Sequence, residues 1–215
     1  MKVLFTGAHP DDIESGTGGC MARLKDLGHE VHGLSFTDGQ VGYYEKDKTP
    51  EEVGAMRRSE MLAASRILGY IPHFAGHMDG SLCAGPGEIK SFLSLLEEIS
   101  PEMLFSHWPV DTHPDHRASA SIALSAWLKY KGKDAFYYYE VLTGRQTHCF
   151  NPVSYVDIEK YEGLKFKAYL SHLSQKLSNE FGLKQHRKRG CEAGRVCCEA
   201  FIPLADSENR KMLFE

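Results

Sequence analysis

Short apolar runs alternate along the chain with longer segments in which apolar residues recur every three or four positions. The longer segments predict helices, and the runs predict strands. The expected strands are 2–6, 29–36, 71–75, 103–106 and 135–141, and the expected helices are 15–27, 51–68, 88–99 and 115–131. Strands that alternate with helices of this length are typical of a parallel sheet covered on both faces. We therefore expect an α/β protein with a three-layer α/β/α, Rossmann-like fold and a mostly parallel sheet.

The last third of the chain has a less regular pattern. It predicts a short strand at Tyr155–Ile158, a helix at Glu162–Leu177 and an apolar segment near Phe201–Leu204. The glycine-rich stretch Gly76–Pro86 is expected to be a long loop. No Pro/Ser-rich tract, charge block or repeat divides the chain, so residues 1–215 are expected to form a single domain.

Composition narrows the class of protein further. Hydrophobic residues make up 42% of the 215 residues and charged residues 25%, which is typical of a globular chain rather than a disordered one. The formal net charge of −4 gives nucleic acid and anionic membranes nothing to attract them. No apolar stretch approaches the ~20 residues that a bilayer requires, and the start does not resemble a signal peptide. We expect a cytoplasmic protein whose six cysteines stay reduced.

Two segments that follow strands are rich in metal-binding side chains. The first is Ala8–Glu14, with the sequence AHPDDIE, and the second is His107–Arg117, with the sequence HWPVDTHPDHR. The carboxyl ends of parallel strands form the edge where ligands bind in α/β sheets. Many titratable groups at one edge are unfavourable unless their charge is compensated, and a divalent cation is the simplest compensation.

The spacing of these residues suggests how a metal would be held. A catalytic zinc site takes three protein ligands and leaves one position open. His9 and Asp12 are three residues apart and can project from one turn, while His113 and His116 have the same spacing at the start of a helix. The pattern predicts His9, Asp12 and one histidine of the second segment as ligands, and it leaves the choice between His113 and His116 open.

Together the two segments resemble the PIG-L/LmbE-like metal-dependent deacetylases, which remove N-acetyl groups from amino sugars. The resemblance rests on Ala8–Gly19 and Asp111–Ala118, with weaker matches that include Arg57 and Asp79-Gly80. It implies that zinc, or another divalent metal such as Fe²⁺, is bound by His9, Asp12 and His116. It implies a small-molecule N-acetyl amino sugar as the substrate.

The resemblance also implies roles for four other residues. Asp11 is the implied general base, and His113 stabilises the oxyanion or protonates the leaving amine. Asp115 orients or tunes its neighbour, and Arg57 contacts the substrate. Some members of the family carry an arginine where this chain has Thr112.

Two other readings of the same residues stay open. Two histidines and one carboxylate also form the facial triad of iron oxygenases, and a non-catalytic sugar-binding protein could keep a metal for structure alone. The segment Gly16–Gly19 lacks the glycine spacing of a dinucleotide site, which argues against NAD. The sequence does not determine which sugar is bound or what the loop Thr143–Cys149 does. It is compatible with a monomer and with a homo-oligomer.

Overall fold

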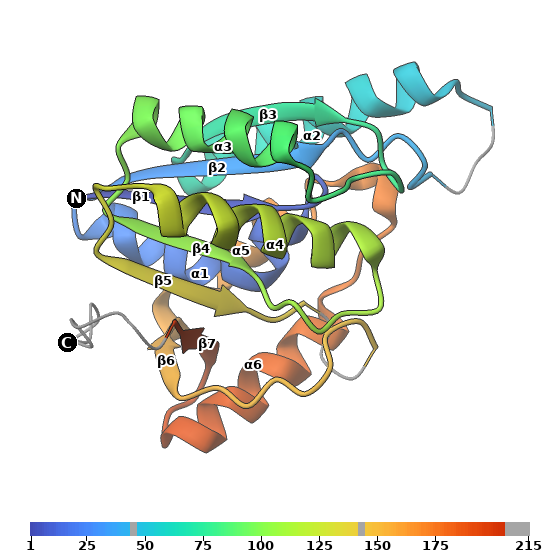
Figure 1. Ribbon diagram of the computed structural model, residues 1–215. Coiled ribbons are helices and arrows are strands. Elements are labelled where there is room, and N and C mark those ends of the chain that lie inside the picture. Colours follow the sequence, from blue (N-terminus) through green and yellow to red (C-terminus); the bar gives the residue numbers. More distant parts are fainter. Residues whose placement is uncertain (44–46, 142–144, 205–215) are drawn as a thin grey trace.

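A mostly parallel sheet of seven strands forms the middle layer of the computed structural model, which describes residues 1–43, 47–141 and 145–204 (Figure 1). The strand order is β3-β2-β1-β4-β5-β7-β6. The strands are β1 (Lys2–Gly7), β2 (Glu30–Thr37), β3 (Ile71–His77), β4 (Met103–His107), β5 (Ala135–Tyr139), β6 (Ser154–Asp157) and β7 (Cys198–Pro203). Strands β1 to β5 are parallel, and β7 runs antiparallel to both β5 and β6.

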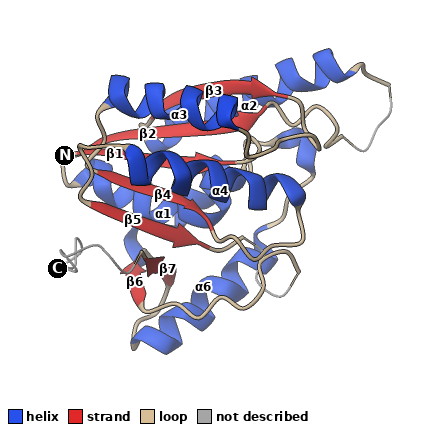
Figure 2. Cartoon of the chain, in the orientation of Figure 1, coloured by secondary structure: helices blue, strands red, loops and turns tan. Residues whose placement is uncertain are grey.

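Helices cover both faces of this sheet, which confirms the predicted three-layer α/β/α fold (Figure 2). The helices are α1 (Asp12–Asp26), α2 (Pro50–Leu68), α3 (Pro86–Ile99), α4 (Pro114–Lys129), α5 (Glu162–Tyr169) and α6 (Asn179–Ala193), with 3-10 turns at Glu159–Tyr161 and Leu173–Gln175. Among the described helices, none has both the length and the hydropathy needed to cross a lipid bilayer.

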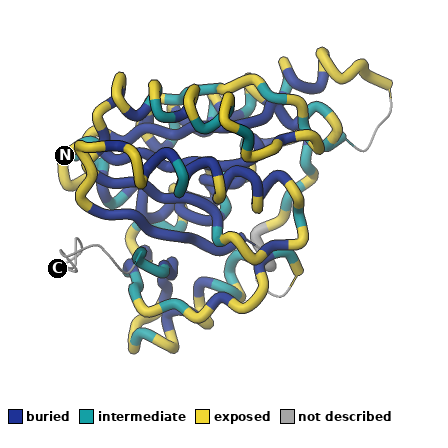
Figure 3. The backbone as a smooth tube through the Cα atoms, viewed as in Figure 1, coloured by how far each residue is buried: buried dark blue, intermediate teal, exposed yellow. Residues whose placement is uncertain are grey.

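The sheet divides the hydrophobic core into two layers because successive side chains of a strand point to opposite faces. Val3 and Phe5 of β1 pack with α1 and α2, whereas Leu4 between them packs with α3 and α4. The central strands are therefore buried on both sides, and exposure is concentrated on the outer sides of the helices (Figure 3).

Helix α1 lies unusually close to the sheet because its inward positions are glycines. A Cβ atom on Gly16 would lie 2.3 Å from the ring of Tyr139 on β5, and one on Gly19 would lie 2.6 Å from Ile158. Such distances are shorter than atoms tolerate, so these positions exclude any side chain. The close approach positions the N-terminus of α1, and with it Asp11 and Asp12, against the carboxyl ends of β1 and β4.

The predicted helix Glu162–Leu177 is wrong in its second half. Helix α5 ends at Tyr169, and the chain continues through a 3-10 turn. Ser171 donates a hydrogen bond to the carbonyl of Ala168, and the fully buried His172 turns toward Glu14 of α1. Contacts between distant segments override the local helical pattern here.

Helix α6 was not predicted, and β3 extends two residues into the stretch expected to be a loop. The pattern of α6 gave no signal because, among residues 182–193, the buried positions are His186, Arg189 and Gly190 rather than large apolar residues. The guanidinium of Arg189 instead pairs with the carboxylate of Glu140 at 2.6 Å through two hydrogen bonds. Strand β7 begins at Cys198, three residues before the predicted apolar segment.

We expect Gly16→Ala to lower the free energy of unfolding by about 1–3 kcal/mol, the usual effect of overpacking a core. The matched control is Gly163→Ala on α5, where a Cβ would meet nothing within 4 Å. That substitution should leave stability unchanged or raise it by up to about 1 kcal/mol, because alanine favours a helix over glycine. Urea unfolding of both variants measures the difference. Equal effects of the two substitutions would contradict the close packing of α1.

Candidate metal centre and active-site pocket

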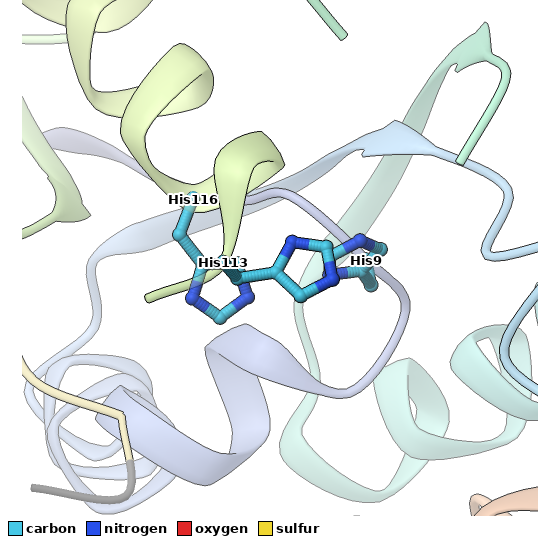
Figure 4. Close-up of side chains that lie close together, drawn as sticks. All are labelled: His9, His113 and His116. Carbon is cyan, nitrogen blue, oxygen red and sulfur yellow. The ribbon is translucent and has the colours of Figure 1, made fainter. Parts of the chain in front are cut away.

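The two polar segments identified in the sequence meet at the carboxyl edge of the sheet. His9 comes from the loop after β1, and His113 and His116 come from the start of α4 (Figure 4). The rings of His9 and His113 lie 4.5 Å apart and those of His9 and His116 lie 5.3 Å apart, measured between centroids. The meeting follows from the sheet order, since β1 and β4 are neighbours and run parallel.

Asp12 lies at the centre of this cluster. Its Oδ2 accepts a hydrogen bond of 2.8 Å from the backbone N–H of His9 and lies 3.1 Å from Nε2 of His107. Its Oδ1 lies 3.5 Å from Nε2 of His116, and Nδ1 of His9 lies 3.4 Å from Oδ2. His9, Asp12 and His116, the three ligands that the family resemblance implies, therefore lie together in one buried cluster.

The outer ring nitrogens of the two histidines face carboxylates. Nε2 of His9 lies 3.1 Å from Asp79 and 3.3 Å from Asp115, and Nδ1 of His116 lies 3.2 Å from Asp111. Carboxylates behind metal-binding histidines hold the ring in place and increase its basicity. Burial lowers the pKa of His9, but hydrogen bonds to Asp115, Asp12 and Asp79 outweigh it and raise that pKa well above its ordinary value.

Asp11 lies beside the cluster in a strained conformation. Its φ of 118° is in the region that favours glycine, and such strain is concentrated at functional sites. Its Oδ2 lies 3.2 Å from Nη2 of Arg57, which also donates to the carbonyl of Pro10 at 2.8 Å. Burial raises the pKa of Asp11 to about 6, against the opposing effect of Arg57.

Arg57 reaches this position from α2 and is 3% exposed. Besides Asp11 and Pro10, it donates to the carbonyl of Gly39 at 3.1 Å. The arginine lines the pocket, and its described contacts hold the turn that carries Asp11.

His113 is the N-cap of α4, and its Nδ1 accepts a hydrogen bond of 3.3 Å from the backbone N–H of Asp115. A neutral ring that accepts at Nδ1 carries its proton on Nε2, so Nε2 is the nitrogen available to donate to a ligand. Burial, together with the neighbouring His9 and His116, lowers the pKa of His113. The geometry gives the pocket a neutral hydrogen-bond donor beside His9.

Asp115 contacts His9 and the loop after β3. Its Oδ2 accepts from the backbone N–H of Gly80 at 2.6 Å, and its Oδ1 accepts from that of Leu82 at 3.2 Å. It therefore fixes the loop that carries Asp79 as well as the ring of His9.

Sequence reasoning assigned no role to His107, Asp79 or Asp111, which complete the cluster. His107 and Asp111 lie inside the second polar segment, and Asp79 belongs to a weaker match of the resemblance. The sequence therefore contained a signal for all three residues, but it did not indicate what each one contacts. The ring of His107 stacks on that of His116 with centroids 4.1 Å apart. Burial lowers the pKa of His107 to about 4, which keeps this ring neutral at pH 7.

The cluster forms the floor of a pocket of about 320 Å³. Its walls include Ser15, Gly42, Val141, Gln146, Tyr169, Gln175 and Leu177. Within the loop Thr143–Cys149, Gln146 is the residue that lines the pocket, whereas Thr143 and Gly144 lie outside the described residues. The segment after α5 supplies one wall because Ser174 is bound to Glu60 and Gln175 to the carbonyl of Gly42.

The donor set of the site is suited to a divalent cation. One ring nitrogen of His9 and one of His116 lie beside the carboxylate of Asp12. The other ring nitrogen of each histidine faces a different aspartate. Five aspartates surround the pocket floor, at positions 11, 12, 79, 111 and 115, and among the described residues Arg57 is the one arginine that pairs with a carboxylate of this set, that of Asp11. Buried carboxylates in such excess require a positive charge for compensation. Among the described residues, four sets of side chains lie close enough together to hold a metal ion: His9, His113 and His116; Asp12, His107 and His116; His9, Asp79 and Asp115; and Glu162, His186 and Cys197. The first two sets each share two members with the ligand set that the family resemblance implies.

Comparisons with known proteins agree with this description. A family model described as PIG-L, GlcNAc-PI de-N-acetylase, matches residues 4–127. A curated relative, diacetylchitobiose deacetylase of Thermococcus kodakarensis, is 27% identical over 187 residues, which cover 81% of this chain and 70% of the relative. The solved structure of N,N'-diacetylchitobiose deacetylase from Pyrococcus horikoshii superposes with a TM-score of 0.87 at 26% identity, covering 94% of this chain and 83% of that one.

A relative with a different activity also aligns with most of the chain. The 4-oxalmesaconate hydratase of Pseudomonas putida is 24% identical over 211 residues, which cover 90% of this chain and 81% of the relative. Similarity over the whole chain therefore does not by itself determine the reaction.

The chain is an α/β protein with a His/Asp cluster and a pocket at the carboxyl edge of its sheet. The family model covers more than half of the chain. The chain therefore belongs to the PIG-L family of deacetylases, which are amide hydrolases, as the two motifs predict.

Proposed function

We propose that this protein is a zinc-dependent hydrolase that removes the acetyl group from an N-acetylated amino sugar or amino-sugar conjugate. The observation that carries the proposal is Asp12 held between His9 and His116, with Asp11 beside it and outside this set. The two diacetylchitobiose deacetylases among the similar proteins support an amino sugar as the substrate.

His9, Asp12 and His116 would hold the metal. A divalent ion bound there would lower the pKa of a water molecule to about 7 and polarise the carbonyl of the acetamide. Two nitrogen ligands and one oxygen ligand are a set that zinc accepts, and Fe²⁺ is the main competitor for the same set.

Asp11 is suited to accept the proton of the attacking water. Its carboxylate contacts Arg57 rather than the two histidines, and the strained turn aims it into the pocket that the histidines also line. Burial favours proton uptake by this carboxylate, as a general base requires. Arg57 positions Asp11 through the contact between the two side chains. It also contacts the substrate in the proposed complex.

His113 is suited to stabilise the oxyanion. Its Nδ1 is occupied by the N–H of Asp115, so its Nε2–H points away from α4 and can donate to the acetyl oxygen as negative charge develops there. Asp115 acts through His9 and the loop after β3, and we class it as a positioning residue.

The proposed reaction balances without another reactant. The water oxygen forms a bond with the acetyl carbon, and the carbon–nitrogen bond breaks. The proton taken by Asp11 passes to the leaving nitrogen, which yields acetate and the free amine of the sugar.

We expect the zinc-loaded protein to release one amine and one acetate from N-acetylglucosamine or its glycosides. An amine-reactive fluorophore measures the first product and an acetate assay the second. The control is the hydratase reaction, followed as loss of 4-oxalmesaconate. Hydration of that compound without amine release from any N-acetyl sugar would assign the chain to the hydratase reaction. Metal content without either reaction would favour a sugar-binding protein, and iron with oxygen uptake would favour an iron enzyme.

Asp11 and Asp12 are adjacent and chemically identical. Replacing each one in turn by asparagine therefore distinguishes the general base from the metal ligand. Asp11→Asn should keep about one metal per chain while kcat falls by roughly 10²–10⁴-fold, because an amide cannot accept the proton. Asp12→Asn should lose the metal, because a neutral amide is a poor ligand. Elemental analysis beside kcat measures both. A metal-free Asp11→Asn together with a metal-loaded Asp12→Asn would reverse the two roles.

The three-histidine set makes a different prediction for His113. If His113 donates to the oxyanion, His113→Ala keeps the metal and loses about 10²–10³-fold in kcat. If His113 is instead a ligand, the same variant loses the metal as His9→Ala does. Metal content of the two variants, measured side by side after dialysis, distinguishes the two sets.

A further inference from the structure

A separate group of metal-binding side chains lies where α5, α6 and the start of β7 meet, and Figure 1 shows α6 beside the strands β6 and β7. Glu162 begins α5, His186 lies in the middle of α6, and Cys197 directly precedes β7. One ligand atom from each of the three side chains lies within 4.8 Å of the other two. The proposed reaction uses none of these residues.

Helix α5 separates this group from the active-site pocket. Glu162 is the first residue of α5, and Tyr169, which lines the pocket, is the last. With a rise of 1.5 Å per residue, about 10 Å of helix lies between them. An ion held by Glu162 would therefore be remote from the reacting atoms, and the partial exposure of Glu162 gives it a path from solvent.

Cys197 and Glu162 offer a sulfur and an oxygen ligand. The fully buried Sγ of Cys197 donates to Oε1 of Glu162 at 2.9 Å. Burial and this hydrogen bond raise the pKa of the thiol, so it stays protonated until a cation displaces the proton. A metal ion deprotonates a coordinating thiol outright. Sulfur and oxygen ligands of one tetrahedral zinc are about 3.5 Å apart, so the pair needs to open by only about 0.6 Å.

His186 offers a nitrogen ligand. Its ring is 3% exposed, and its Nε2 accepts a hydrogen bond of 2.8 Å from Nζ of Lys165. Its Nδ1 is buried and has no hydrogen-bond partner among the described residues. Buried ring nitrogens are normally paired, and a bound ion is one of the few explanations for one that is not. Burial, with Lys165 and Arg187 nearby, lowers the pKa of His186 well below its ordinary value, which favours the neutral ring that a metal requires.

The charges around the group are balanced and can stay so when a dication binds. Lys165 pairs with Glu199 at 2.7 Å, and Arg187 pairs with Oε2 of Glu162 at 2.9 Å, which leaves Oε1 for the metal. Because Lys165 donates to Nε2 of the histidine ring, Nδ1 carries the ring proton. A metal at Nδ1 and Sγ therefore displaces two protons, one from the ring and one from the thiol. The net charge of this buried group does not change.

We propose that Glu162, His186 and Cys197 form a second metal site, distinct from the one in the active-site pocket and selective for zinc. A ligand set of one sulfur, one nitrogen and one oxygen suits zinc, whereas Mg²⁺ and Ca²⁺ take oxygen ligands. The ion would join α5, α6 and the start of β7, so its role is structural. The site does not depend on the proposed reaction.

Cobalt(II) tests for the sulfur ligand in the unmodified protein. The ligands proposed for the active-site pocket are nitrogen and oxygen, so they give no thiolate-to-cobalt charge-transfer band. We expect this band in the near-ultraviolet spectrum of the wild-type protein with two equivalents of cobalt. His9→Ala, which removes a ligand of the active-site pocket, should keep the band. A wild-type protein without the band would overturn the proposal.

Substitution of adjacent cysteines assigns the sulfur. Cys197→Ser should abolish the band and lower the zinc content by one ion per chain. The matched control is Cys198→Ser, because Cys198 is equally buried and lies outside the ligand set. It should change neither property. His186→Asn should repeat the loss through a different ligand, which keeps the test decisive if Cys197→Ser does not fold.

The outcomes of this test do not depend on the active-site metal. One zinc that is kept in His9→Ala and lost in Cys197→Ser supports the second site even if the active-site pocket binds none. A zinc content and a band that Cys197→Ser leaves unchanged would overturn the second site even if the protein is an active deacetylase.

Proton release gives an independent measure of ligation. Zinc is titrated by calorimetry into His9→Ala in buffers with different enthalpies of protonation. We expect two protons to be released for each zinc bound, because the thiol and Nδ1 both lose one. Zinc binding without proton release would contradict the site, since a cysteine ligand must lose its proton.

Discussion

The site depends on one buried carboxylate, Asp12, held among imidazoles where two parallel strands end together. Its oxygens contact the backbone N–H of His9 and the rings of His107 and His116. A buried carboxylate is stable only when its hydrogen bonds and charge are compensated. Each contact of Asp12 in turn places a group of the pocket. The neighbouring positions of β1 and β4 bring these contacts within reach, and the glycines of α1 let Asp12 approach the sheet.

Stability and function compete in this part of the molecule. The positive φ of Asp11 is of a kind that costs about 1–3 kcal/mol, and five carboxylates surround the same pocket floor. The two hydrophobic layers of the sheet, which pack against helices on both sides, supply the stability that offsets this strain. Two local contacts also stabilise the strained turn and its neighbouring loop. Arg57 donates to the carbonyl of Pro10, and Asp115 accepts hydrogen bonds from the backbone N–H groups of Gly80 and Leu82.

Relatives of this chain have more than one activity, since both deacetylases and a hydratase align with most of its length. The reaction must therefore be argued from the side chains at the sheet edge. The side chains to argue from are those of the His/Asp cluster at the ends of β1 and β4.

The sequence by itself determined the order of the first five strands and four helices, because each carries an apolar pattern, and a glycine follows each of the first two helices. Gly28 and Gly69, which end the first two helices, have the positive φ values that such positions require. The sequence also indicated His9, Asp11, Asp12, His113, Asp115 and His116 as candidates, since both motifs follow strands and such residue types at that place have few other uses. Their ligand and catalytic roles remain predictions.

Only the tertiary structure decided what depends on contacts between distant segments. It ended α5 at Tyr169 because His172 is buried against Glu14, and it formed α6 on a polar inward face whose Arg189 pairs with Glu140, the residue after β5. It brought Asp79 to His9 and Asp111 to His116, and it engaged Arg57 with Asp11. Periodicity and motif spacing report local preference, whereas the partner of a buried charge is set by which strands become neighbours in the sheet.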